Sequence, residues 1–105
     1  MSTALSTRSA SDPDLIATAE LFRLLGAPVR LAILGQLVAG PRCVHDLVDA
    51  LGHSQALVSQ HLRTLRYGRI VSAQRRGREM VYRIDDSHIE HIITDALTHV
   101  EEENR

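Results

Sequence analysis

The sequence predicts a mainly α-helical domain with one β-hairpin, and three observations lead to this fold class. Five segments carry apolar residues at helical spacing, one segment has strand-like alternation beside a glycine turn, and 105 residues suffice for one compact domain. Aromatic residues make up only 3% of the chain, so the core must be built from aliphatic side chains. A chain of this size gains stability by burying a further apolar face in a partner, which favours a dimer.

The N-terminal part of the chain predicts an arm and then a first helix. Residues 1–12 are polar and aperiodic, so we expect a mobile, disordered arm there and one folded domain over 13–105. Asp12 and Pro13 are typical of a helix start, and Gly26 of a helix end. The apolar face between them serves either the core or a dimer seam. Its members are Leu15, Ala19, Phe22 and Leu25.

Two further helices follow the first. Pro28 suits the first turn of the second helix, which stops at Gly40 and Pro41. A third, shorter helix is predicted from about Cys43 to Leu51, and Gly52 breaks it. The inward positions of these two helices are Val29, Ile33, Leu34, Leu37, Val44, Leu47, Val48 and Leu51.

A fourth helix completes a helix-turn-helix. Ser54 is a good N-cap for a helix that runs to about Tyr67. Two short helices, a tight turn that contains glycine and a polar face on the second helix are typical of this motif. The apolar positions of the fourth helix are Leu57, Val58, Leu62 and Leu65.

A basic hairpin and a last helix complete the predicted domain. Residues 70–84 form two arms around Gly77, and an arginine-rich hairpin directly after a helix-turn-helix is typical of a wing. The last helix starts at about Asp86 and has no breaker before the end of the chain. Its apolar positions are Ile89, Ile92, Ile93, Ala96, Leu97 and Val100. The sequence therefore predicts a winged helix-turn-helix of five helices plus a wing.

The formal net charge of −1 hides a strong segregation of charges along the chain. Seven arginines and one acid, Glu79, lie between Arg63 and Arg83. Seven acids and one arginine lie between Asp85 and Arg105. The first of these segments suits a phosphate backbone and the second suits cations.

The cysteine content and the N-terminal composition bear on location. Cys43 is the single cysteine, so no disulfide can form within the chain. The stretch from Met1 to Ser11 lacks the apolar run of a signal peptide, and no apolar run approaches the roughly 20 residues of a membrane-spanning helix. We therefore expect a cytoplasmic protein without a membrane partner.

The fourth helix and the wing tip carry side chains suited to DNA. Short or forked hydrogen-bonding groups on a helix can reach base edges or phosphates in the major groove, and arginines at a hairpin tip can contact phosphate or the minor groove. The alternative, purely structural roles are a solvated helix face, a solubilising turn and, for His61, a partly buried histidine with an internal partner. The predicted DNA-contacting residues are Ser54, Gln55, Ser59, Gln60, His61, Arg63, Arg75, Arg76 and Arg78.

Four stretches resemble the ArsR/SmtB family of metal-sensing repressors. They are Leu24 to Leu34 (LLGAPVRLAIL), Cys43 to Leu47 (CVHDL), Val58 to Leu65 (VSQHLRTL) and Gly77 to Ile84 (GREMVYRI). The likeness covers about residues 15 to 103. It implies a homodimeric repressor that binds double-stranded operator DNA at an imperfect inverted repeat, with metal binding lowering the affinity for DNA.

The last helix contains a constellation with the chemistry of a metal site. His88 and His99 are eleven residues apart, which places them within roughly 20° on one helix face but about 16 Å apart along the axis. One ion with bonds of about 2.0–2.2 Å cannot reach both. Two antiparallel copies of the helix solve this, because Asp86 and His88 of one copy then face His99 and Glu102 of the other. The sequence thus predicts two symmetric sites, each shared between subunits.

Two nitrogen and two carboxylate ligands suit tetrahedral Zn²⁺, with Co²⁺ as a mimic, while Ni²⁺ usually prefers more ligands but stays possible. These four positions match the zinc site of the SmtB-like branch, and the resemblance also implies that His99 donates to the backbone carbonyl of Arg69. His91 is either a fifth ligand or incidental, while Asp85, Glu101 and Glu103 are expected to be solvated. The alternative is an acidic surface helix whose histidines are solvated and bind no metal.

A second candidate metal site involves Cys43 and His45. The resemblance places paired cysteines of soft-metal sensors on the third helix, and here His45 replaces one of them, so a buried or semi-exposed Cys43 is the better interpretation.

Other classes of function fit less well. No HExxH pattern is present, four protein ligands leave zinc no open position for water, and nothing suggests a small organic substrate, so we expect no enzyme. A metal-buffering protein would have little use for a basic wing. A metal-independent or thiol-responsive winged-helix regulator stays open as the alternative.

Overall fold

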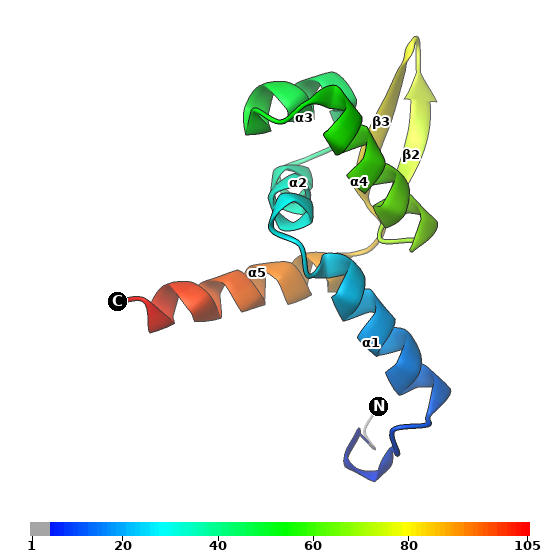
Figure 1. Cartoon of the computed structure of the whole chain (residues 1–105), viewed down its shortest axis with the longest axis vertical. Helices are drawn as coiled ribbons and strands as arrows, with labels where there is room; N and C mark the ends of the chain where they lie inside the picture. Colours follow the sequence, from blue (N-terminus) through cyan, green and yellow to red (C-terminus); the bar gives the residue numbers. More distant parts are fainter. Residues whose placement is uncertain (1–4) are drawn as a thin grey trace.

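The computed structural model describes residues 5–105 and confirms the predicted fold class (Figure 1). The chain contains five α-helices and a small antiparallel sheet, and a short 3₁₀ turn precedes them. The helices are α1 (Pro13–Leu25), α2 (Pro28–Val38), α3 (Val44–Leu51), α4 (Gln55–Tyr67) and α5 (Ser87–Glu103). The strands are β1 (Arg42–Cys43), β2 (Val71–Arg76) and β3 (Glu79–Ile84), and the 3₁₀ turn is Leu5–Thr7.

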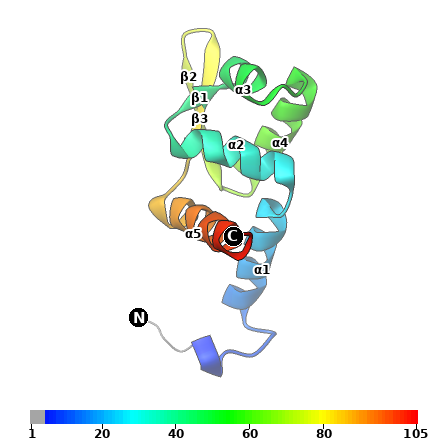
Figure 2. The same ribbon diagram turned by 90° about the vertical axis from the view of Figure 1, so that its left-hand side faces the viewer.

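The body of the domain is formed by α2, α3, α4 and the sheet, which share one aliphatic core (Figure 2). The predicted inward positions of α2 and α4 are buried, with the exceptions of the partly buried Val29 and Leu57. Fully buried side chains come from all these elements and from the residue before β2, and they are Ile33, Leu34, Leu47, Val58, Leu62, Leu65, Ile70 and Val71. This core fixes α3 and α4 against each other as the sequence pattern predicted.

The sheet contains one strand that the sequence pattern did not predict. Its strand order is β1-β3-β2, and Cys43 of β1 pairs with Val81 of β3. The third helix consequently begins at Val44 rather than at Cys43, which is its N-cap residue. A strand of two residues is too short to show alternation, so only its partner could have indicated it.

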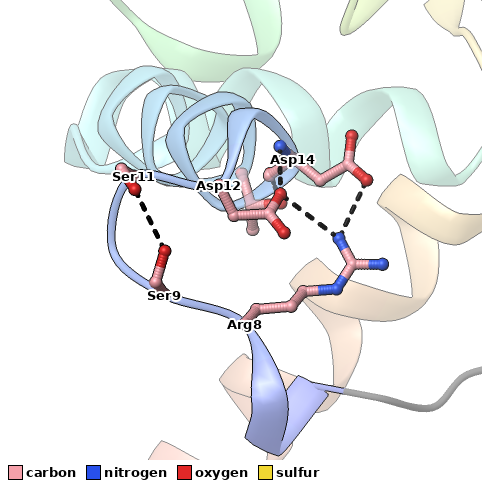
Figure 3. Close-up of polar contacts among 6 residues, drawn as sticks. Arg8, Ser9, Ser11, Asp12 and Asp14 are labelled. Atoms are coloured by element: carbon pink, nitrogen blue, oxygen red, sulfur yellow. Dashed lines mark hydrogen bonds and ion pairs between the residues drawn. The ribbon is translucent and has the colours of Figure 1, made fainter.

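The start of α1 is fixed by local polar contacts (Figure 3). The side chain of Asp12 caps the helix by accepting a hydrogen bond from the backbone N–H of Asp14, at 2.7 Å. Arg8 folds back onto the same turn, where Nη1 lies 2.8 Å from Asp14 Oδ2 and 3.5 Å from Asp12 Oδ1. Residues 1–4 lie outside the described residues, and the mobility of the arm over 1–12 stays a prediction.

Most of the apolar face of α1 does not join the core. Figures 1 and 2 show α1 and the second half of α5 projecting from the body. Only the C-terminal end of α1 is buried, at Leu24 and Leu25, whereas Ala19 is exposed and Phe22 is 54% exposed. The core alternative for this face is therefore wrong over most of its length, since the helix leaves the body after one packed turn.

An apolar groove with a volume of about 570 Å³ lies between α2 and α5. Apolar side chains of both helices line it, and several of them are exposed. They include Leu31, Ile92, Ala96, Leu97 and Val100. Within the described residues no single helix is long and apolar enough to cross a membrane, and only the bent pair of α1 and α2 meets that criterion jointly.

The C-terminus of α4 ends in a Schellman motif. The N–H of Ile70 bonds to the carbonyl of Leu65 at 2.9 Å, and the N–H of Arg69 bonds to that of Arg66 at 3.0 Å. Arg69 has φ of 61°, the left-handed conformation that this motif normally assigns to glycine. A Cβ on the preceding Gly68 would clash with Cδ1 of the buried Leu24.

These two neighbouring positions give opposite stability predictions. Arg69→Gly is expected to stabilise the domain by about 1 kcal/mol, because glycine adopts φ above zero without steric cost. Gly68→Ala is expected to destabilise it by about 1–3 kcal/mol, because Leu24 must leave its packed position. Thermal unfolding of both variants checks this. Two shifts of the same sign would contradict the assignment of the αL position to Arg69.

Candidate functional site

The fourth helix presents its polar face to solvent. Ser54 caps it by accepting a hydrogen bond from the N–H of Leu57 at 3.1 Å, so this predicted DNA contact also has a structural role. Gln55, Gln60 and Arg63 are exposed, and Ser59 is partly buried. The helix is therefore anchored by its apolar side with its hydrogen-bonding side chains free to meet a groove of DNA.

The wing carries its arginines at an open hairpin tip. In the β2–β3 register Arg76 pairs with Glu79, which leaves Gly77 and Arg78 as a two-residue loop. Gly77 has φ of 66°, as the first position of a type II′ turn requires. The side chains of Arg75, Arg76 and Arg78 are all exposed.

A groove of about 280 Å³ joins the start of α4 to the wing. Gln55 and Arg78 both line it, so two predicted DNA-contacting elements lie side by side (Figure 1). Cys43, His45 and Glu79 line the same groove. Glu79 is the one acid of the basic segment, and its carboxylate opposes close approach of a phosphate at this point.

Cys43 and His45 differ in burial, and no third ligand-type side chain among the described residues joins them in a metal-binding cluster. Cys43 is buried, with 7% of its surface exposed, and burial raises the pKa of its thiol above the usual value. His45 is exposed, and its Nε2 lies 3.2 Å from Oδ2 of Asp49, one turn along α3. The protonated thiol of Cys43 is a poor ligand and a poor redox sensor at neutral pH.

The first pair of predicted metal ligands lies together at the start of α5. Oδ1 of Asp86 accepts the N–H of Ile89 at 3.1 Å and thereby caps the helix. The same oxygen lies 3.8 Å from Nδ1 of His88, whose side chain is 91% exposed. The second carboxylate oxygen of Asp86 and the imidazole of His88 are therefore available to bind a metal ion.

The second pair lies near the other end of α5. The side chain of His99 is 73% exposed, and its Nε2 lies 3.9 Å from Oε2 of Glu103, whereas no contact joins it to Glu102 among the described residues. Asp85, Glu101 and Glu103 are exposed, as expected, and so is His91. Within residues 5–105 no hydrogen bond joins His99 to Arg69, so that link stays a prediction.

The four ligand residues do not converge within one chain. Among the described residues no three His, Cys, Asp or Glu side chains lie close enough together to hold a metal ion. The donor types still fit zinc, because two accessible imidazoles and two carboxylates are ligands that it accepts. A site built from these four residues would therefore need ligands from a second α5.

Sequence reasoning missed a contact that joins α4 to the rest of the body. Nε of Arg30 donates to Nδ1 of His61 at 3.1 Å, and Nη1 donates to the carbonyl of Leu24 at 3.0 Å. The signal was the helical spacing of Arg30 with the buried Leu34 and Leu37, which places a cation on an inward face. His61 is partly buried with an internal partner, as one of its two interpretations expected.

The polar face of α4 is exposed beside a basic wing, an arrangement typical of winged helix-turn-helix regulatory proteins. Residues 27–73 match the bacterial regulatory protein family arsR. The chain is 52% identical over 89 residues to the HTH-type transcriptional repressor SmtB of Mycobacterium tuberculosis, across 85% of this chain and 66% of that protein. It is 41% identical over 83 residues to the transcriptional regulator NmtR of Mycobacterium tuberculosis, across 79% of this chain and 69% of that protein.

Solved structures agree with these sequence relatives. The antimony-specific transcriptional repressor AntR has a TM-score of 0.81 at 30% identity, over 99% of this chain and 96% of that one. A homodimeric winged helix-turn-helix DNA-binding domain from Mycobacterium bovis has a TM-score of 0.79 at 26% identity, over 97% and 92%.

The chain belongs to the ArsR family, in the branch of the SmtB repressor. The alignment with SmtB spans just under two thirds of the length of that relative. These relatives are named as transcriptional regulators and repressors, which agrees with the predicted class of protein.

Proposed function

We propose that this chain is a metal-responsive transcriptional repressor that acts as a homodimer. The metal-free dimer binds an imperfect inverted-repeat operator, and zinc binding between the two α5 helices weakens that binding, which derepresses genes of metal efflux or storage. The observation that carries the proposal is that the two halves of the predicted metal site lie at opposite ends of α5, with Asp86 and His88 at one end and His99 and Glu102 at the other. Beside them lies an apolar face that nothing in the single chain covers. We call each pair of residues a metal half-site.

The uncovered apolar surface supports the dimer. Exposed large apolar side chains gather on α1, the start of α2 and the end of α5. Those on these three helices are Ile16, Phe22, Leu31, Leu97 and Val100, while Leu5 and Tyr67 are exposed elsewhere. Surface patches of this kind mark interfaces, and a related solved structure is described as homodimeric. A second copy of this chain is the occupant that also completes the metal site.

The two half-sites support sharing across the dimer axis. A twofold axis that packs the α5 helices antiparallel brings Asp86 and His88 of one protomer opposite the end of α5 that carries His99 and Glu102. The imidazoles and carboxylates supply two nitrogen and two oxygen ligands to each ion, a set that suits tetrahedral Zn²⁺, with Co²⁺ as a mimic and Ni²⁺ less well matched. Holding both helices to one ion changes how the two α4 helices are spaced.

Operator binding with and without metal tests the proposed switch. We expect Zn²⁺ to weaken binding of the dimer to its operator by about 5- to 150-fold, the range of typical allosteric couplings. Because coupling is reciprocal, operator DNA must weaken zinc binding by the same factor. Titrations at fixed salt measure both, since phosphate contacts make affinity salt-dependent. Unchanged operator affinity with zinc bound would favour the metal-independent regulator, and no affinity without metal would favour a buffering protein.

A further inference from the structure

Arg30 ties three helices together through one guanidinium group. It projects from α2 and donates from Nε to His61 on α4 and from Nη1 to the carbonyl of Leu24 in the last turn of α1. Both bonds are partly buried, at 3.1 and 3.0 Å. The α4 partner is separated from Arg30 by 31 positions in the chain, so the contact depends on the packed domain.

The bond to Arg30 fixes the hydrogen position on His61. A neutral imidazole carries one N–H, and Nδ1 here accepts a hydrogen bond, so the hydrogen must lie on Nε2. Burial, the charge of Arg30 and the nearby His53 all lower the pKa of His61. These groups act on the ring from α2 and from the turn before α4, and no described carboxylate pairs with it. His61 is therefore neutral near pH 7, with a single tautomer.

The Nε2–H of His61 is left open to an outside acceptor. No described residue accepts a hydrogen bond from it. In the described part of the chain every fully buried side-chain nitrogen and oxygen has a partner, so Nε2 must reach solvent. The ring thus has Nδ1 bonded inward to Arg30, while Nε2 keeps access to solvent.

We propose that Arg30 is a positioning residue for α4, the helix predicted to contact DNA. Arg30 holds His61 so that the Nε2–H of His61 donates to a phosphate oxygen of the DNA backbone. This inference rests on the proposed DNA-binding function. A phosphate fits better than a base edge, because one N–H cannot make the bidentate contact that discriminates bases. Phosphate contacts fix the register of a protein on the duplex, which suits a side chain locked by a neighbouring helix.

The first test needs no DNA. Nitrogen-15 NMR of the imidazoles is expected to show His61 in the Nε2–H tautomer in the wild type. Arg30→Met, which removes charge and donors at similar length, is expected to give a mixture of tautomers and a raised pKa of His61. Arg30→Lys should restore the tautomer partly. Arg23→Met, which removes a cation from exposed α1, is the matched control. An unchanged tautomer in folded Arg30→Met would overturn the positioning role.

The second test is a double-mutant cycle on operator binding of the metal-free dimer. Arg30→Met and His61→Ala are each expected to weaken binding by about tenfold, the cost of one lost hydrogen bond to a charged group. The double variant should lose little more than His61→Ala alone, because both changes remove the same contact. Additive losses of about a hundredfold would show that Arg30 does not act through His61.

The two tests separate this inference from the proposed function. If the wild type binds no operator, the proposed function and the phosphate contact fail together, while the NMR result still decides whether Arg30 positions His61. If the wild type binds operator and His61→Ala binds as tightly, the phosphate contact alone is overturned. Thermal unfolding of each variant establishes that the compared proteins are folded.

Discussion

Combining one His88→Ala protomer and one His99→Ala protomer in a dimer is expected to restore metal binding. The homodimer of either variant is expected to lack it. The reason is the geometry of α5, which keeps the two histidines at opposite ends of a 17-residue helix. A site shared between antiparallel copies takes one histidine from each protomer. In the mixed dimer one site lacks both histidines, whereas the other keeps both.

Cobalt absorption spectroscopy on purified heterodimers measures this restoration. Each protomer carries a different affinity tag, and intense tetrahedral bands report the site. We expect about two cobalt ions per wild-type dimer, about one per heterodimer, and in each homodimeric variant an affinity lowered by more than about 100-fold, since even second-shell losses cost 10–100-fold.

His91→Ala is the matched control, because it removes an exposed histidine from the same helix. Loss of bands there would make His91 a further ligand. Heterodimers that bind no cobalt, or single variants that keep half of their sites, would contradict a site shared between subunits. A thiolate-to-cobalt charge-transfer band would instead assign the metal to Cys43.

The elements that local chemistry determines could be predicted from the sequence. Asp12 and Ser54 cap α1 and α4 through their own neighbours, and Gly77 takes the positive φ of the hairpin turn. The period of the buried positions in α2 and α4 was readable for the same reason, since each helix carries its own pattern.

The features that the sequence did not predict all depend on long-range partners. Strand β1 exists because Cys43 meets Val81, and the hydrogen bond from Arg30 to His61 exists because α2 packs on α4. The apolar face of α1 fitted either the core or a dimer seam, because the periodic pattern does not say which surface covers it, and Phe22 remains exposed in the single chain.

The candidate site divides along the same line. His88 and His99 could be assigned to one face because both belong to a single helix of known period. The association of their two ends could only be inferred, because it needs a second chain. The predicted role of Arg69 depends in the same way on a contact with His99 that the single chain does not contain.

Leu97→Asp is expected to convert the dimer into monomers. Leu97 is 57% exposed in the single chain and lines the apolar groove between α2 and α5 with Leu31 and Val100. A twofold axis repeats the substitution on both protomers, so two carboxylates enter the dimer interface. Burying each carboxylate there costs several kcal/mol. Sedimentation equilibrium measures the change in mass, and Thr98→Asp, which adds the same charge at the next, exposed position, should remain a dimer.

The metal affinity of Leu97→Asp gives the sharper result, because this variant keeps all four ligand residues. If the site is shared, zinc affinity must collapse together with the dimer and recover at high protein concentration, since association and metal binding are linked. A monomer that still binds zinc tightly would confine the site to one chain. A dimer that persists would place the seam on α1, around Ile16 and Phe22, and would leave α5 free of the partner that its two half-sites require.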